Sequence, residues 1–182
     1  MEFGIEGLGV LYDAGKESQM SELSQFKTLT ELAEIIKQLR DLEKEQFFAR
    51  PVRRGGHPVL YANTIGVQFR TVCGVRVCDY QLSSDEQWVE ANDQMGLSFS
   101  GDWQHLKSVH KMISRYEKTP VDVFWLLGDA NLPPGMAFKP DMAKKGHYFL
   151  AVIERMKLST LITNLELVAH RMSMINHVSL DK

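Results

Sequence analysis

Residues 121–156 constrain the fold of this 182-residue chain more than any other segment. They read VDVFWLLGDANLPPGMAFKPDMAKKGHYFLAVIERM, which predicts a strand, a rigid turn at residues 132–135, a short extended segment ending at Asp141, and a second strand that opens with Gly-His-Tyr. Adjacent residues of a strand point to opposite faces, so only one of His147 and Tyr148 can face the core. The other faces a surface or a cleft, which makes this pair the first candidate for function.

Length and composition indicate one soluble domain. A chain of 182 residues buries roughly 70% of the surface that its unfolded form exposes, so one compact core is expected. The chain is 44% hydrophobic and 24% charged with a net charge of -2, which indicates neither disorder nor a nucleic-acid-binding surface. No apolar run approaches the ~20 residues that span a bilayer, so neither membrane insertion nor a cleaved signal is expected.

The cysteines and histidines show no familiar metal or redox spacing. Cys73 and Cys78 match neither a Cys-x-x-Cys redox site nor half of a zinc site, and two cysteines make no disulfide framework. His105 and His110 are five apart and diverge on a helix, so no metal site is expected. A thiol nucleophile with His147 as its base remains an alternative to the usual role of strand cysteines as small core residues.

The first fifty residues differ from the rest by their helical period. Residues 28–49 place apolar side chains on one face and charged side chains elsewhere, which predicts an amphipathic helix. The apolar side chains are Leu32, Ile35, Ile36, Leu39 and Leu42. Pro51 closes this helix, and Arg50–His57 is predicted to be a loop. We therefore divide the chain into an N-terminal helical segment, 1–50, and a main domain, 51–182; the helix either belongs to the same domain or docks a partner.

The main domain interleaves short strands with helices. Beside the segment already described, strands are predicted at 58–61, 67–72, 75–80 and 97–101, with a tight hairpin at Cys73-Gly74. Helices are predicted at 83–96, from Asp102 to Thr119, and from Leu158 to Ile175. This irregular order predicts an α+β domain rather than a doubly wound sheet.

Two further motifs carry polar side chains that suit a binding site. Ser98 and Ser100 share one face of a predicted strand while Leu97 and Phe99 occupy the other. The two hydroxyls therefore either line a cleft or lie on a solvent-facing edge strand. The paired arginines of the Arg50–His57 loop either bind a phosphate or diphosphate or are simply solvated.

Taken in chain order, these motifs resemble those of a known family. The order is Leu60-Tyr61, Gly96-Leu-Ser98-Phe-Ser100, Val123-Phe124, the turn at 132–135, Asp141, and Gly146-His147-Tyr148. Over about residues 58–175 the chain is similar to the type VI secretion toxins that have an ADP-ribosyltransferase-like fold. The resemblance implies a split, strongly curved β-sheet core with flanking helices and a cleft shaped for NAD.

The resemblance also implies a biological role. Such a toxin is made in the bacterial cytoplasm, secreted, and delivered to the cytosol of a recipient cell. An immunity protein neutralises it in the producing cell, and a component of the secretion system is a possible second partner. A catalytically inactive binding or adaptor protein on the same fold is the alternative.

The resemblance assigns roles to individual side chains. Breaking the nicotinamide–ribose bond passes through an oxocarbenium-like state, so the site must hold the dinucleotide and stabilise developing positive charge. His147 is expected in the cleft with the two serines beside it, and Tyr61 offers a ring face or a hydroxyl. The expected catalytic residues are His147, Ser98 and Glu154, and the expected cofactor-binding residues are Tyr61, Ser98, Ser100, His147 and Arg70.

The chain departs from the family pattern at two places. The family's first strand usually carries an arginine just after its Leu-Tyr pair, where this chain has Ala62, so Arg70 is expected to substitute. Tyr12 is an alternative anchor for that strand, in which case the 28–49 helix is an insertion. Glu154 is the one glutamate expected in a suitable strand, but alternation places it opposite His147.

Overall fold

The computed structural model describes residues 34, 46–62, 69–116, 120–128 and 132–175. The apolar stripe of the predicted N-terminal helix and the alternative anchor Tyr12 lie outside these residues.

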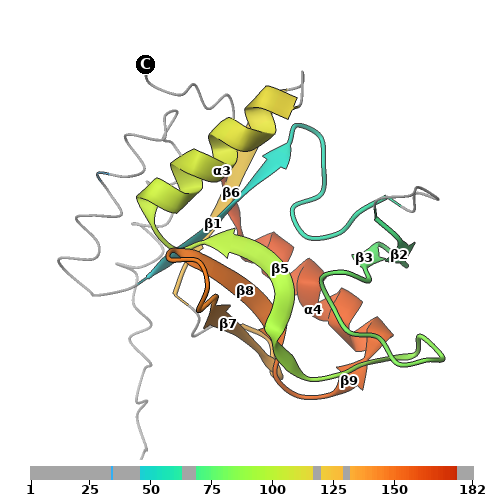
Figure 1. The fold of residues 1–182 in the computed structure, drawn as a ribbon. Coiled ribbons are helices and arrows are strands. Elements are labelled where there is room, and N and C mark those ends of the chain that lie inside the picture. The colour runs from blue at the N-terminus through green and yellow to red at the C-terminus, as the bar shows by residue number, and fades with distance from the viewer. Residues whose placement is uncertain (1–33, 35–45, 63–68, 117–119, 129–131, 176–182) are drawn as a thin grey trace, which may run out of the picture.

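The described residues form a mixed α+β fold built on a six-stranded antiparallel sheet (Figure 1). In spatial order its strands are β10 (Ser173–Ile175), β6 (Val121–Leu127), β1 (Phe47–Arg53), β5 (Asn92–Ser100), β8 (His147–Val152) and β7 (Met136–Pro140). The α+β class predicted from the sequence is therefore confirmed.

The sheet consists of two three-stranded halves that meet at one residue pair. β1 pairs with β6 along its whole length, from Phe47 to Arg53. It pairs with β5 only through Ala49 and Ser100. β5 in turn is irregular between Asn92 and Leu97, where the register to β8 shifts. Such a shift bends a strand and increases its twist, which accounts for the curvature of β5 in Figure 1.

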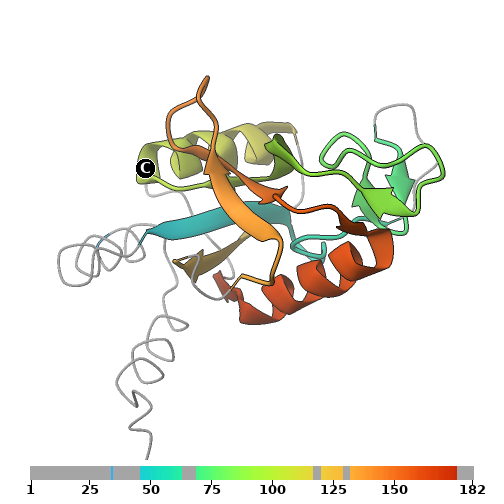
Figure 2. The same ribbon diagram turned by 90° about the horizontal axis from the view of Figure 1, so that it is seen from below.

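Two helices cover the sheet from opposite sides. Figure 2 shows α3 (Trp103–Tyr116) on one side of the strands and α4 (Leu158–Arg171) on the other. Because strand side chains alternate, the sheet presents a different set of residues to each helix. Phe99 and Leu150 face the side of α4 and pack with its fully buried Leu161 and Leu165. The larger part of the apolar core therefore lies between the sheet and α4.

A smaller lobe is attached beside the first turn of α4. It contains the hairpin β2 (Thr71–Val72) and β3 (Val75–Arg76) and the pair β4 (Trp88–Val89) and β9 (Met156–Lys157). The hairpin turns at Cys73 and Gly74, whose φ angles of 50° and 85° lie in the left-handed region. The predicted tight hairpin is thus confirmed.

The prediction of a helix to Ala49 followed by a loop over Arg50–His57 is wrong. Residues 47–53 are β1, because Phe47, Phe48 and Ala49 are buried in the sheet and the strand pairs fully with β6. A boundary between residues 50 and 51 would cut this strand. Pro51 is tolerated in it, although it donates no hydrogen bond. Of the paired arginines for which phosphate binding and simple solvation were the alternatives, Arg54 donates from Nε to Asp122 Oδ1 at 3.2 Å.

Two other local predictions are wrong. Residues 83–96 form no helix; Ser83 Oγ accepts from Trp88 N and Asp85 Oδ1 accepts from Gln87 N, so side chains fix a turn that leads into β4 and β5. Residues 58–61 form no strand. The terminal helix ends at Arg171 and is followed by β10, while α3, β6, β7 and β8 lie where they were predicted.

The burial of side chains on α3 does not simply follow their hydrophobicity. Met112, an apolar residue of α3, is 51% exposed. Instead, His105 and His110 are buried on that helix. None of the helices within the described residues is long and apolar enough to cross a membrane.

Gly96 is the position where the sheet is least tolerant of a side chain. It lies in the irregular part of β5, and a Cβ there would overlap the backbone carbonyl of Leu150 on β8. We expect Gly96→Ala to lower the free energy of unfolding by about 3 kcal/mol, because backbone rather than a flexible side chain must move. Urea denaturation checks this.

Gly55→Ala is the matched control for Gly96→Ala. Unlike Gly96, Gly55 has a left-handed φ of 78°, and a Cβ there meets no atom within 4 Å. The cost should be the strain of that conformation, about 1 to 2 kcal/mol. Equal losses in the two variants would contradict the overlap between β5 and β8.

Candidate functional site

The register between β5 and β8 brings predicted site residues together. Ser100 lies directly opposite His147, and Ser98 lies opposite Phe149. Directly opposed residues point to the same face of a sheet, so Ser98, Ser100 and His147 share the face that α3 partly covers. We call Ser100, His105, Asp141 and His147 the histidine cluster.

His147 is held by a carboxylate. Its Nδ1 lies 2.8 Å from Asp141 Oδ2, and its side chain is 12% exposed. The ring meets Phe149 edge-on at 4.7 Å between centroids and lies 5.3 Å from the ring of His105. Its Nε2 makes no hydrogen bond to another described residue. The pair therefore leaves one imidazole nitrogen available to a ligand.

Asp141 is itself held by the turn that precedes β8. Its Oδ1 accepts a hydrogen bond of 2.8 Å from Ala143 N, and its backbone nitrogen donates to His147 O. The hydrogen bonds from His147 and from the Ala143 amide lower the pKa of Asp141 below its ordinary value. The carboxylate is consequently charged at neutral pH.

His105 joins the cluster from the first turn of α3. Asp102 precedes the helix, and its Oδ1 accepts from His105 N at 2.7 Å, which is the contact of an N-cap. His105 Nδ1 shares a hydrogen bond of 2.8 Å with Ser100 Oγ. Its Nε2 is buried without a partner among the described residues. Burial, reinforced by the charges of Lys144 and His147, lowers the pKa of His105.

Gly146 lets the turn before β8 lie close to the start of α3. Gly146 has a φ of 78°, and a Cβ at this position would overlap the carboxylate of Asp102. Gly101 N also donates a 2.8 Å hydrogen bond to Gly146 O. A glycine is therefore required for the turn and the helix to lie this close.

A second group of polar residues lies where β1 and β5 separate. The Arg50 guanidinium donates to Ser98 O at 2.7 Å, to Pro58 O at 2.9 Å and to the hydroxyl of Tyr61. Arg76 stacks on the Tyr61 ring, 4.2 Å from its centroid. Burial lowers the pKa of Arg50 to about 10, so its guanidinium is charged at neutral pH. We call Arg50, Tyr61 and the Ser98 carbonyl the arginine junction.

Ser98 connects the two groups. Its carbonyl belongs to the arginine junction, while its side chain is exposed on the face of the histidine cluster. Ser100, by contrast, is buried and 1% exposed. Ser98 thus has the hydroxyl that a ligand can reach, and Ser100 has one that holds His105.

The remaining predicted site residues lie elsewhere. Arg70 is exposed and bonds Glu86 in the small lobe. Glu154 does not lie in a strand as expected, because β8 ends at Val152; it is exposed in the turn before β9, at the far end of β8 from His147. The structure therefore brings Ser98, Ser100 and His147 together but not Arg70 or Glu154.

Sequence reasoning missed Arg50, Asp141 and His105 as partners in these groups. Arg50 was assigned to a loop because the predicted helix ran too far. Asp141 was recognised as part of the motif order, but not as the partner of His147. Asp102 is a usable signal for His105, because an N-cap at Asp102 starts the helix there and places His105 in its first turn.

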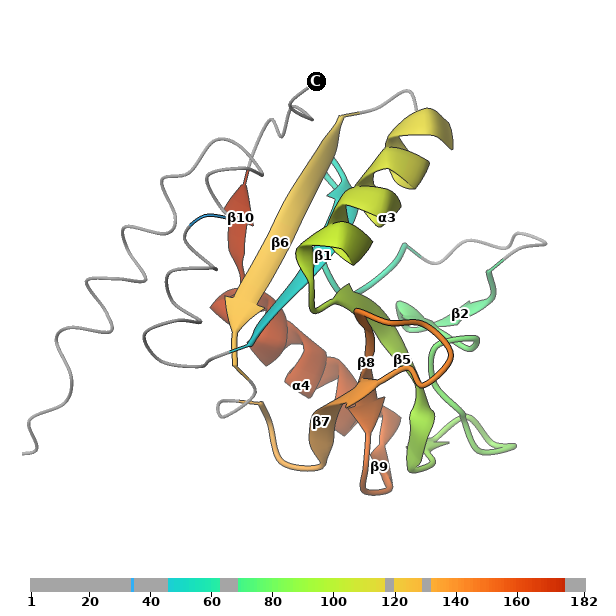
Figure 3. The same ribbon diagram turned by 60° about the vertical axis from the view of Figure 1, so that its left-hand side comes forward.

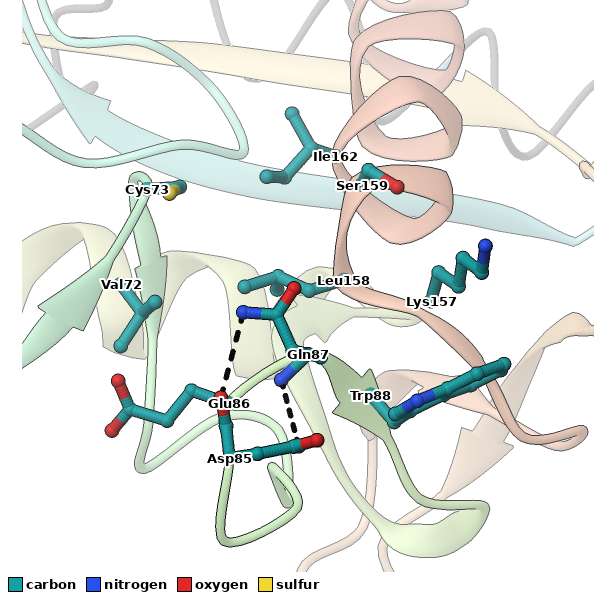
Figure 4. A pocket seen from close by; sticks show the side chains of 10 residues that line it. All are labelled: Val72, Cys73, Asp85, Glu86, Gln87, Trp88, Lys157, Leu158, Ser159 and Ile162. Carbon is teal, nitrogen blue, oxygen red and sulfur yellow. Dashed lines mark hydrogen bonds between the residues drawn. The ribbon is translucent and has the colours of Figure 1, made fainter.

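A separate pocket of about 460 Å³ lies in the small lobe (Figure 4). It is lined by Val72, Cys73, Asp85, Glu86, Gln87, Trp88, Lys157, Leu158, Ser159 and Ile162. Cys73 and Cys78 are exposed free thiols and not core residues as expected. The pocket contains no residue of the histidine cluster or the arginine junction.

No three of the described histidine, cysteine, aspartate and glutamate side chains lie together so as to hold a metal ion. Comparisons of the chain with protein-family models, with curated proteins and with solved structures found no match.

The buried histidines of α3 predict a pH dependence of stability. Burial lowers the pKa of both His105 and His110 below 6.5 in the folded state. The unfolded chain therefore binds more protons as the pH falls below 6.5, so the free energy of unfolding falls with it. Urea denaturation at pH 7 and pH 5 measures the loss.

His110→Leu isolates one of these contributions. His110 Nε2 is buried without a partner among the described residues, so leucine should keep the fold and reduce the loss between pH 7 and pH 5. His170→Gln is the control because His170 is exposed on α4. An unchanged pH dependence in His110→Leu would show that this buried imidazole does not carry the effect.

Proposed function

We propose that this protein is a secreted bacterial toxin whose sheet binds NAD beside the histidine cluster, as its resemblance to the ADP-ribosyltransferase-like toxins implies. In this proposal it is delivered to the cytosol of a recipient cell by a secretion system. An immunity protein neutralises it in the cell that produces it.

The register that sets His147 opposite Ser100 is the observation that carries the proposal. It puts the imidazole and the accessible hydroxyl of Ser98 on one face of two adjacent strands. A dinucleotide needs polar groups that hold its riboses and its amide, and hydroxyls and an imidazole supply them.

The separation of β1 from β5 supports the same proposal. The family is expected to have a split sheet and an arginine on its first strand, and here Arg50 on β1 reaches across the gap to Ser98 and Tyr61. Its three hydrogen bonds suit a guanidinium that shapes the site. Arg50, rather than Arg70, is therefore our choice for the family's arginine.

A second function is favoured by the position of Glu154. Transferases of the family present a glutamate in the site, whereas Glu154 is exposed in the turn before β9. The alternative is therefore a catalytically inactive binding or adaptor protein on the same fold. Titration with NAD, together with a search for labelled ADP-ribose on lysate proteins and nucleic acid, separates the two functions.

Calorimetric titration with NAD tests the proposed site. We expect saturable binding to the parent protein and about tenfold weaker binding to Ser98→Ala, because one hydrogen bond contributes roughly 0.5 to 1.5 kcal/mol. Ser108→Ala, an exposed serine on α3, should bind like the parent. Absence of saturable binding at millimolar NAD would overturn the proposal in favour of the adaptor.

Expression in bacteria tests the toxin role. His147→Ala and Ser98→Ala should relieve growth inhibition, while Ser108→Ala should not. Circular dichroism establishes that each variant is folded. Full toxicity of both folded variants would mean that the site lies elsewhere.

A further inference from the structure

The turn between β7 and β8 presents a fixed carboxylate to His147. Lys144 N donates to Asp141 O at 3.2 Å, and His147 N donates to Lys144 O at 3.1 Å. One carboxylate oxygen of Asp141 is bound by a backbone amide, and the other lies 2.8 Å from the imidazole. Both partners are therefore positioned before any ligand arrives.

This arrangement determines which imidazole nitrogen can act. A charged carboxylate accepts a hydrogen bond from Nδ1–H of the neutral ring, which leaves Nε2 without a proton. A carboxylate that orients an imidazole in this way also stabilises the imidazolium formed when Nε2 takes a proton. The pair Asp141–His147 thus has the geometry of a general base.

The residues near His147 favour an imidazole rather than a glutamate as the base. Neither β5 nor β8 contains a glutamate, and Glu154 lies beyond the far end of β8. The other ionisable groups near His147 are His105 on α3, Asp102 just before that helix, and Lys144 in the turn. His105 and Asp102 are already engaged with Ser100 and the helix backbone, so they do not compete for the role.

We infer that His147, oriented by Asp141, is the general base that activates water to hydrolyse NAD, which extends the proposed function from binding to a reaction. The water oxygen forms a bond to the anomeric ribose carbon as the bond from this carbon to the nicotinamide nitrogen breaks. The electron pair of the broken bond leaves with neutral nicotinamide, and the water proton goes to His147 Nε2. The products are ADP-ribose, nicotinamide and one proton, which His147 releases to solvent.

His147 and Asp141 have different roles in this reaction. His147 contacts the attacking water, whereas Asp141 acts through His147 and is a positioning residue. General-base catalysis contributes roughly 10²- to 10⁴-fold, and the loss of an orienting carboxylate about 10- to 100-fold. We therefore expect a larger fall in kcat from His147→Gln than from Asp141→Asn.

The experiment measures nicotinamide release and NAD binding separately on the full chain. The variants are His147→Gln, Asp141→Asn and, as a control, Asp93→Asn, which replaces an exposed carboxylate at the other end of β5. His147→Gln should release nicotinamide at least about 100-fold more slowly and Asp141→Asn about 10- to 100-fold more slowly. NAD affinity should stay within threefold of the parent in Asp141→Asn and fall by no more than about tenfold in His147→Gln, whose imidazole also holds the dinucleotide. Asp93→Asn should match the parent.

Two further readouts separate positioning from a structural role. In Asp141→Asn kcat should fall while KM stays near that of the parent, because Asp141 acts through His147 and does not contact NAD. Added imidazole should restore part of the activity of His147→Ala. A purely structural role for the pair would produce neither effect.

The possible outcomes are distinct. Absence of NAD binding by the parent would overturn both the proposed function and this inference. NAD binding without nicotinamide release would overturn the inference alone. A folded His147→Gln that releases nicotinamide at the parental rate would do the same, and if that variant does not fold, a parental kcat in Asp141→Asn decides against the inference.

Discussion

The single contact between the two halves of the sheet governs the rest of this structure. β1 and β5 share the pair Ala49 and Ser100 and then part, which leaves backbone groups of β5 without a strand partner on that side. The guanidinium of Arg50 supplies the missing donor to the Ser98 carbonyl. A hydrogen bond from a charged guanidinium is stronger than one between neutral groups, so Arg50 links β1 to β5 where their backbones no longer pair.

The elements that the sequence predicted correctly are those with a strong local signal. The 132–135 turn contains two prolines and a glycine, and the strands on either side of it have no competing helical pattern. Helices α3 and α4 follow the 3.6-residue period closely. The pairing of Ser100 with His147 was expected only as proximity, because register between residues 47 apart in the chain is not encoded locally.

The failed predictions share one cause, which is tertiary contact overriding a local pattern. The helical period of the N-terminal segment gave no reason to stop before Phe47, yet pairing with β6 makes residues 47–53 a strand. In 83–96 the side chains of Ser83 and Asp85 bind turn amides, and no helix starts there. The same misassignment hid Arg50, since a residue placed in a solvated loop is not considered as a partner for β5.

The close approach of Gly146 to Asp102 joins two segments that are 44 residues apart in the chain. The start of α3 and the turn before β8 lie together at the end of the paired strands β5 and β8, where Ser100 opposes His147. Contacts of long sequence separation form slowly, because the entropy of closing the intervening loop must be lost first. We therefore expect the histidine cluster to be completed late in folding: a chain that has formed only its helices and hairpins has the pair Asp141–His147 but not Ser100 and His105 beside it.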